Sequence, residues 1–292
     1  LYAKIPLLRE RKEARPAMLS CTKMNGNGND FIMIDNRTRS YGAEELARFA
    51  RLLCRRCLSV GADGLLVVEP SERADFRMRL FNSDGSEGEM CGNGARCIAR
   101  YAFEKGIVKS PSMRFETLGG EVCASVDGRM AALELAPVSL DEAVRGRVTV
   151  DGVDYEYTYI IVGVPHTVIF EEKRSRAFAD YAPLGRAIRE RTDLFPRGTN
   201  VNFTVAAGGG LDVMTYERGV EDMTLSCGTG STASAIAAMQ LGLCGAEVRV
   251  TNPGGVNVVK LAFSEDGRTV FPKLEGAMLM TAELEILPEA LL

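Results

Sequence analysis

The chain has 292 residues, with 35 Lys and Arg against 39 Asp and Glu and a formal net charge of −4. Its shares of hydrophobic residues (46%) and charged residues (25%) are those of a globular protein and exclude a disordered or fibrous chain. The single histidine, His166, excludes zinc sites built from several histidines. The mildly acidic charge argues against nucleic acid as a partner.

The length allows two domains, each large enough to bury its own core. No apolar stretch approaches the roughly 18 residues that a membrane span requires, so we expect no membrane segment. Residues 1–17 mix charged and apolar side chains without the continuous apolar region of a secretory signal, and we expect them to be an N-terminal extension. Eight cysteines in a chain of this length indicate reduced thiols and a cytoplasmic protein.

Short β-branched and apolar runs between turn residues predict many strands, and four segments have helical periodicity. In chain order, the predicted elements are strand 31–34, helix 43–57, strands 65–68 and 76–81, helix 94–104, strands 131–135, 157–162 and 167–170, helix 181–190, strands 202–205 and 212–216, helix 232–241, and strands 247–251, 257–263 and 282–287. Cys54 and Cys57 have C-x-x-C spacing, but no second pair follows, so we expect two thiols on a helix rather than a metal or redox site.

Two segments of the chain share one plan. The segment CGNGARCIARYAFEKG begins at Cys91, and the segment CGTGSTASAIAAMQLG begins at Cys227. Both open with Cys-Gly-x-Gly, continue as an apolar helix and end in a glycine at the same offset. A Gly-Gly turn follows each segment, at 119–120 and at 254–255. The chain is therefore expected to contain an internal structural repeat.

The repeat predicts an α+β fold with two pseudo-symmetric domains. Each domain would be a sheet curled around one buried helix, and the active site would lie in the cleft between the two. We expect the first domain to comprise residues 18–135 and 277–292, and the second to comprise residues 136–276.

The position of Cys91 and Cys227 at helix starts indicates reactive thiols. Unpaired backbone N–H groups and the positive end of the helix dipole favour an anion there, which lowers the pKa of a thiol and can also hold a carboxylate. Taken singly, either cysteine could equally be a packing residue, and we expect Cys97, Cys123 and Cys244 to be small apolar residues. The equivalent placement of the pair favours catalysis.

Two thiols on opposite sides of a cleft suit the inversion of a stereocentre. One thiolate would remove the proton from a carbon, and the opposite thiol would return a proton to the other face. Because no dinucleotide motif and no lysine suited to a carbonyl cofactor is present, we expect no cofactor and no metal.

The chain resembles the diaminopimelate epimerase family, cofactor-independent two-cysteine epimerases of lysine and peptidoglycan synthesis. The resemblance runs from Thr22 onward and is carried by the segments TKMNGNGNDFIMID, LFNSDGSEGEMCGNGARC, GVPHTV, FPRGTNVNF and YERGVEDMTLSCGTG. It implies two similar α+β domains, each a β-barrel-like sheet around a central helix. It also implies interconversion of LL- and meso-2,6-diaminopimelate, a free small-molecule substrate; a homodimer is a possible assembly.

The resemblance also implies roles for individual residues. Cys91 and Cys227 match the two acid/base residues, and His166 and Glu217 match positions thought to adjust the cysteine pKa values. The positions that match substrate-binding residues are Asn29, Asn82, Gly92, Asn93, Asn200, Glu217, Arg218, Gly228 and Thr229. The chain also departs from the family pattern. Val164 stands where many members have an asparagine, Gly64 where some have a glutamine and Asn25 where a histidine is common, and the ERGVEDM stretch is one residue longer than the commonest spacing.

Three alternatives remain open at this point. A related cofactor-independent racemase would act on a simpler amino acid such as histidine or proline. A thiol redox sensor would use the two cysteines to form a disulfide. A non-catalytic binder would hold an amino acid without exchanging its α-proton.

Overall fold

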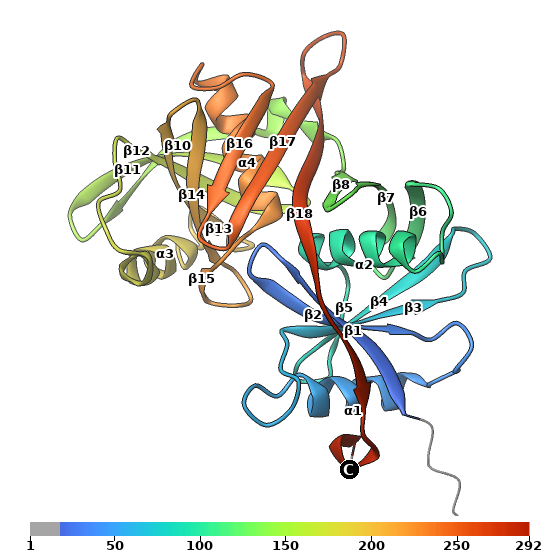
Figure 1. Ribbon diagram of the computed structural model, residues 1–292. Helices are drawn as coiled ribbons and strands as arrows, with labels where there is room; N and C mark the ends of the chain where they lie inside the picture. Colours follow the sequence, from blue (N-terminus) through green and yellow to red (C-terminus); the bar gives the residue numbers. More distant parts are fainter. Residues whose placement is uncertain (1–17, 292) are drawn as a thin grey trace, which may run out of the picture.

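The computed structural model of the chain describes residues 18–291 (Figure 1), so the extension expected over residues 1–17 lies outside the described residues. The helices are α1 (Ala43–Leu53), α2 (Gly92–Glu104), α3 (Ala182–Arg189) and α4 (Gly228–Gln240), with short 3-10 turns at Leu140–Glu142, Phe178–Tyr181 and Pro288–Leu291.

The strands of the first part of the chain are β1 (Leu19–Gly26), β2 (Asn29–Asp35), β3 (Gly64–Glu69), β4 (Phe76–Asn82), β5 (Glu87–Gly88), β6 (Ser112–Thr117), β7 (Gly120–Asp127), β8 (Met130–Glu134) and β9 (Val138–Ser139). Those that follow are β10 (Val144–Val150), β11 (Val153–Val162), β12 (Val164–Glu171), β13 (Asn200–Ala207), β14 (Gly210–Glu217), β15 (Asp222–Thr224), β16 (Glu247–Asn252), β17 (Gly255–Phe263) and β18 (Thr269–Ile286).

A sheet curls around the buried helix α2 in the part of the chain that we call the first half, residues 18–135 and 277–291 (Figure 1). Successive side chains of a strand point to opposite faces of the sheet. In β2, Phe31 and Met33 therefore pack with α2, whereas Ile32 and Ile34 pack with α1 on the other face. The alternation lets one sheet carry two apolar cores.

The second half, residues 136–276, repeats this plan around α4. In β12, Val168 joins the core around α4, while the neighbouring Ile169 joins a second core that contains Leu184 and Ile188 of α3. Each half thus has one helix inside its curled sheet and one outside. The predicted α+β fold with a repeated plan is confirmed.

Strand β18 belongs to both halves. Its first part, from Val270 to Gly276, pairs with β17, and its second part, from Met278 to Ile286, pairs with β1 (Figure 1). The sequence predicted only 282–287 of this long strand. Charged residues and Pro272 interrupt the apolar alternation of its earlier part, which concealed it. The change of partner after Gly276 supports the domain division that we propose.

Helix α1 is shorter than predicted. It ends at Leu53 and not at residue 57, and Cys57 adopts a left-handed backbone conformation with φ 67°. Cys54 is buried in the core beside α1, while Cys57 is exposed. The expectation that both thiols lie on this helix is therefore wrong. Over residues 18–291, no helix is both long enough and apolar enough to cross a membrane.

The two halves meet closely at a pair of glycine-containing turns. Asn27 and Gly28 form the β1–β2 turn with φ of 53° and 86°, and this turn lies against Gly254 and Gly255 of the β16–β17 turn. A Cβ atom on Gly254 would overlap the backbone carbonyl oxygen of Asn27, and one on Gly28 would lie 2.9 Å from Cβ of Leu225. Only glycine allows this approach.

We predict that Gly254→Ala lowers the free energy of unfolding by about 1–3 kcal/mol, because the added methyl group meets backbone that must shift. Thermal or urea unfolding measures the change. Gly245→Ala is the matched control, since a Cβ at Gly245 meets nothing within 4 Å. Equal stability of the two variants would contradict the close packing of the turns.

Candidate active site

Cys91 and Cys227 are the N-cap residues of α2 and α4, as the repeat predicted. Both have extended backbone, and the backbone N–H of Gly230 donates to Sγ of Cys227 at 3.3 Å. Thr229 Oγ1 lies 3.5 Å from the same sulfur. The Cys227 side chain thus faces a free N–H group of its own helix, whereas Cys91 makes no side-chain cap hydrogen bond.

Burial dominates the pKa of both thiols. It raises the pKa of Cys91, and the N–H groups of Gly94 and Asn93 only partly offset this effect. Burial and then the Glu217 carboxylate raise the pKa of Cys227 well above its usual range. The helix N–H groups lower the thiol pKa values as expected, but desolvation outweighs them in the substrate-free protein, so the net shift of both pKa values is upward. Both residues rest as thiols.

The structure brings the two cysteine segments together across the halves. The side-chain amide of Asn93, two residues after Cys91, donates to the carbonyl oxygen of Ser226, which precedes Cys227, at 3.4 Å. The negative charge of Glu217 raises the pKa of both the Cys91 thiol and the Cys227 thiol. One carboxylate therefore acts on both sulfurs.

Glu217 occupies the end of β14 and is largely buried. Burial raises its pKa, and hydrogen bonds from Thr224 Oγ1, at 2.5 Å, and from the Cys227 thiol lower it. A carboxyl group held in this way can exchange a proton with the neighbouring thiol.

Asn29, at the start of β2, contacts the first cysteine. Its Oδ1 lies 3.5 Å from Sγ of Cys91, and its amide nitrogen donates to Oδ2 of Asp63 at 2.5 Å. The Asp63 carboxylate also pairs with Arg56. Asp63 thus fixes which end of the Asn29 amide faces the thiol.

Asn200, at the start of β13, and Arg218, in the turn directly after β14, lie together. Oδ1 of Asn200 accepts from the backbone N–H of Arg218 at 2.8 Å, and the Arg218 guanidinium donates to the carbonyl oxygen of Arg197 at 2.6 Å. His166 of β12 is paired with Asn200 in the parallel ladder, so these residues share one region of the second half.

His166 is fully buried and neutral. Burial lowers its pKa to about 3, an effect that a hydrogen bond with Asn202 opposes and the charge of Arg218 reinforces. The Asn202 amide nitrogen lies 3.2 Å from Nδ1, and Asn202 Oδ1 accepts from Thr215 Oγ1 at 3.0 Å. Because the Asn202 amide donates to Nδ1, the proton of the neutral ring is on Nε2. Nε2 has no partner among the described residues. His166 therefore offers one N–H donor.

The remaining predicted residues differ in placement. Gly92 and Gly228 begin the two helices, and a Cβ on Gly228 would lie 2.6 Å from Leu274, so the helix start is closely packed. Asn82, by contrast, is exposed, and its side chain bonds to Ser86 of its own turn at 3.0 Å. The structure does not bring Asn82 into contact with the cysteines.

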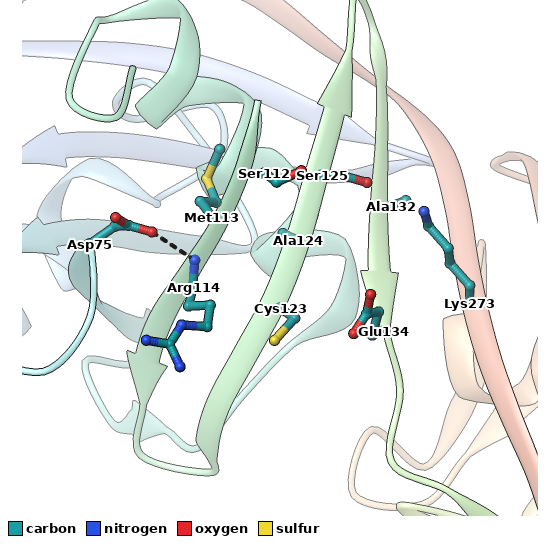
Figure 2. A pocket seen from close by; sticks show the side chains of 10 residues that line it. All are labelled: Asp75, Ser112, Met113, Arg114, Cys123, Ala124, Ser125, Ala132, Glu134 and Lys273. Atoms are coloured by element: carbon teal, nitrogen blue, oxygen red, sulfur yellow. Dashed lines mark hydrogen bonds between the residues drawn. The ribbon is translucent and has the colours of Figure 1, made fainter. Parts of the chain in front are cut away.

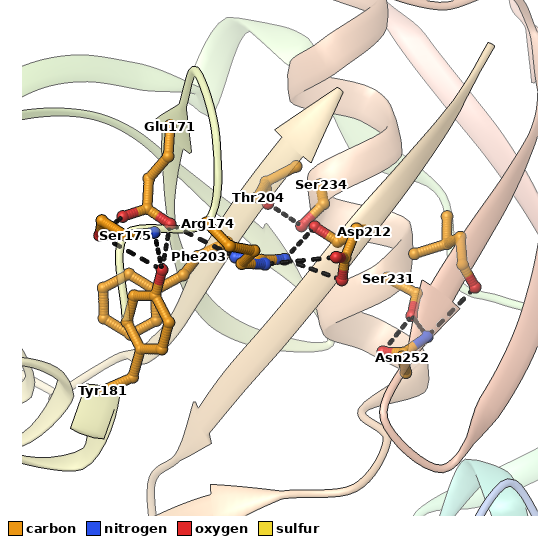
Figure 3. A network of polar contacts seen from close by, with 11 residues as sticks. Glu171, Arg174, Ser175, Tyr181, Phe203, Thr204, Asp212, Ser231, Ser234 and Asn252 are labelled. Carbon is orange, nitrogen blue, oxygen red and sulfur yellow. Dashed lines mark hydrogen bonds and ion pairs between the residues drawn. The ribbon is translucent and has the colours of Figure 1, made fainter. Parts of the chain in front are cut away.

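Buried hydroxyl groups attach α4 to the sheet and so fix the second cysteine (Figure 3). Thr204 donates to Ser234 at 3.1 Å, and Ser231 exchanges hydrogen bonds with Asn252 at 3.2–3.3 Å. In the same view, Arg174 bridges β13 and β14 through the carbonyl oxygen of Phe203 and the carboxylate of Asp212. These contacts hold the frame around Cys227.

A surface cavity of about 440 Å³ lies elsewhere, over strands β6, β7, β8 and β18 (Figure 2). Its lining residues are Asp75, Ser112, Met113, Arg114, Cys123, Ala124, Ser125, Ala132, Glu134 and Lys273. None of them is a predicted site residue, so the cavity is separate from the two cysteines.

Sequence reasoning missed a buried polar cluster beside the cysteines. Arg96, Asn202 and Asn257 are each fully buried. A signal was present for two of them, since Arg96 interrupts an otherwise small and apolar helix face and Asn257 stands in the apolar run GVNVVK. Polar residues in such positions require partners, and partners distant in sequence cannot be read from the pattern.

Solved structures share this fold. A phenazine biosynthesis protein of the PhzF family from Bacillus anthracis matches with a TM-score of 0.70 and 15% identity, over 93% of this chain and 100% of that one. A hydroxyproline epimerase from Agrobacterium vitis matches with a TM-score of 0.67 and 15% identity, over 92% of each chain. At this identity the likeness shows the fold, which is one that epimerases and other isomerases use.

Sequence comparison narrows the class. The family model described as diaminopimelate epimerase matches residues 21–139 and 158–273. Diaminopimelate epimerases from Archaeoglobus fulgidus (44% identity, 85% of this chain and 90% of that protein), Clostridium perfringens (40%, 84% and 93%) and Aquifex aeolicus (41%, 92% and 98%) are similar along most of their length. The chain belongs to the diaminopimelate epimerase family, and the resemblance seen in its motifs is confirmed.

We predict a specific acid sensitivity from His166. The unfolded chain binds a proton at this ring below pH ~6.5, whereas the folded protein does so only below about 3. Stability contributed by the neutral ring is therefore lost as the pH falls between these values, by at most ~1.4 kcal/mol per pH unit.

Unfolding by urea at several pH values measures this slope. Because the chain has a single histidine, the difference between wild type and His166→Gln isolates it. The variant should lose the slope between pH 6 and pH 4, and identical slopes would contradict a buried neutral ring.

Proposed function

We propose that this protein is an isomerase that interconverts LL- and meso-2,6-diaminopimelate by proton transfer between Cys91 and Cys227. The observation that carries the proposal is the pair of N-cap cysteines, at equivalent positions of two halves, whose segments meet through Asn93 and Ser226. Family membership supports the substrate, and lysine and peptidoglycan precursor synthesis is the implied pathway.

The free N–H groups at the two helix starts bind the carboxylate of the reacting centre. Gly92 and Asn93 supply them from α2, and Gly228 and Thr229 from α4. As the α-proton leaves, negative charge builds on this carboxylate, and fixed donors stabilise it most at that moment. The helix ends lower the barrier by this effect and also place the α-carbon between the sulfurs.

The proton transfer conserves all atoms. One thiolate takes the α-proton and becomes a thiol, and the opposite thiol gives its proton to the other face and becomes a thiolate. The thiols titrate as a coupled unit, because only one of them is ionised in each productive state. Since both rest as thiols, a proton must leave when substrate binds. That proton goes to solvent, Glu217 stays a carboxylate, and the substrate ammonium groups compensate the new negative charge on the sulfur.

The remaining polar groups recognise the second amino-acid head group. Arg218 suits a two-point grip on the distal carboxylate, and Glu217 suits an ammonium group. The amides of Asn29, Asn82 and Asn200 complete the polar set, and His166 adjusts the thiol pKa values. Val164 and Gly64 supply no amide, so this chain holds its substrate with fewer side-chain contacts than members that carry amides there.

The decisive experiment is incubation of the reduced protein with LL-diaminopimelate in heavy water without added cofactor. We expect meso product and one α-deuterium per inverted centre, because the returned proton comes from a thiol that exchanges with solvent. Mass spectrometry and chiral chromatography read both quantities. Proline and histidine, tested in the same way, should stay unlabelled; turnover of either in place of diaminopimelate would overturn the substrate assignment.

We predict that Cys91→Ala and Cys227→Ala each lower epimerisation by at least about 10³-fold, because each removes one of two required proton carriers. The exposed Cys57→Ala is the matched control and should keep wild-type activity. Circular dichroism establishes that all three variants are folded. Substantial turnover by either active-site variant would rule out the two-base route.

We expect the protein to act on its free substrate in the cytoplasm. The ground for this proposal is the sequence, since eight cysteines in a chain of this length indicate reduced thiols. Disulfide formation between the two reactive thiols would remove activity, and reductant would restore it.

A further inference from the structure

Arg96 is a fully buried arginine without a carboxylate partner. It lies on α2, one turn after the first cysteine. Nη1 donates to Oδ1 of Asn257 at 2.8 Å and Nη2 donates to Oδ1 of Asn93, while Nε has no partner within residues 18–291. Buried charges in proteins are ordinarily paired with an opposite charge. Two neutral amides leave this cation uncompensated.

The neighbouring groups indicate where the compensating negative charge arises. Burial lowers the pKa of Arg96 to about 10, and only thiols, Cys97 and Cys91, act in the opposite direction. Cys97 lies in the apolar core, 3.5 Å from Sδ of Met278, and burial raises its pKa to about 12. Cys97 therefore stays a thiol, and Cys91 is the neighbour that becomes an anion during turnover.

The charged groups around Cys91 have opposite effects. Glu217 of the second half disfavours its thiolate, whereas Arg96 favours it, together with the N–H groups of Asn93 and Gly94. Arg100, the next arginine on α2, acts on Cys97 and pairs with Glu104. Arg96 is thus the fully buried cation of this helix, one turn after Cys91 and bonded to Asn93.

Arg96 also links the two halves. Asn93 accepts from Arg96 and donates to Ser226, so its side chain is held at both ends. Asn257 accepts from Arg96 and from Asn27 of the first half, and donates to Ser231 at 3.0 Å. The planar guanidinium has a fixed fork of donors, which sets the spacing of the two amides.

Gly276, at the point where β18 passes from the second half to the first, leaves space for the Arg96 side chain. A Cβ on Gly276 would lie 2.9 Å from Nη1 and 3.2 Å from Cζ of Arg96. The guanidinium therefore fills a space that a glycine leaves open beside the junction of the halves.

We propose that Arg96 is a positioning residue that holds Asn93 and Asn257 in register across the two halves and supplies the fixed positive charge that favours the thiolate of Cys91. The proposal rests on the proposed function only in assigning the Cys91 thiolate to removal of the substrate α-proton.

Alkylation by iodoacetamide tests the charge directly and needs no turnover. The full chain, free of substrate, is treated at pH 9, and peptide mass spectrometry reads the rate at each cysteine separately. We expect Arg96→Met to slow alkylation of Cys91 about tenfold, equivalent to a rise of about one pH unit in its titration, and to leave Cys227 within about twofold. The matched control Arg100→Met removes a cation from the same helix and should leave Cys91 unchanged.

An unchanged Cys91 rate in folded Arg96→Met, or an equal effect of Arg100→Met, would overturn the proposal. Should Arg96→Met fail to fold, Asn257→Asp keeps Arg96 in place and gives it a carboxylate that cancels its charge. This variant should also slow Cys91 alkylation at least about fivefold. Normal Cys91 reactivity in this variant would contradict the proposal equally.

The reaction supplies a second measurement. The pH at which kcat/KM rises should move upward in Arg96→Met by the amount by which Cys91 alkylation moves. If the wild-type protein does not epimerise diaminopimelate, the proposed function is wrong. The alkylation rates still decide the role of Arg96 in that case.

Discussion

Two helices of this protein point their N-terminal ends toward the junction of the halves. Positive helix ends repel one another unless an anion lies between them, so the arrangement is complete only with a carboxylate or thiolate in place. The repeated Cys-Gly-x-Gly places a sulfur and several free N–H groups at each end. The curled sheets bury the two helices, and the close turns at Gly28 and Gly254 bring the halves together.

Burial has opposite consequences for binding and for acid/base chemistry. Exclusion of water strengthens the hold of the N–H groups on a carboxylate, but it also raises the pKa of each thiol. A site of this kind cannot keep a resting thiolate without a nearby cation. Substrate ammonium groups provide one such charge at the moment of binding, and the uncompensated guanidinium of Arg96 provides one that is always present. The two thiols therefore stay protonated in the free protein, and one of them ionises when substrate binds.

Local patterns predicted much of this structure. The four helices, the cysteines at helix starts and the repeat all follow from short-range signals, because an apolar period and glycines at fixed offsets do not depend on distant residues. The end of α1 was misplaced, since the helical period continues past Leu53 while Cys57 turns into the left-handed region. The contact of Arg96 with Asn257 joins residues 161 positions apart, and no local pattern encodes it. The effect of burial on the thiols was missed for the same reason.

The passage of β18 through both sheets has a consequence for how the chain acquires its structure. Residues 278–286 of β18 close the sheet of the first half by pairing with residues 19–26 of β1. The first strand to be synthesised therefore completes its pairing only after the last strand has been made. During synthesis, the second half can assemble its core around α4 while β1 is paired only with β2 and still lacks its second neighbour. Such distant pairing raises the contact order and slows folding, and it leaves the edge of β1 open to wrong partners in the interval. The strand that unites the halves thus also makes the first of them dependent on completion of the second.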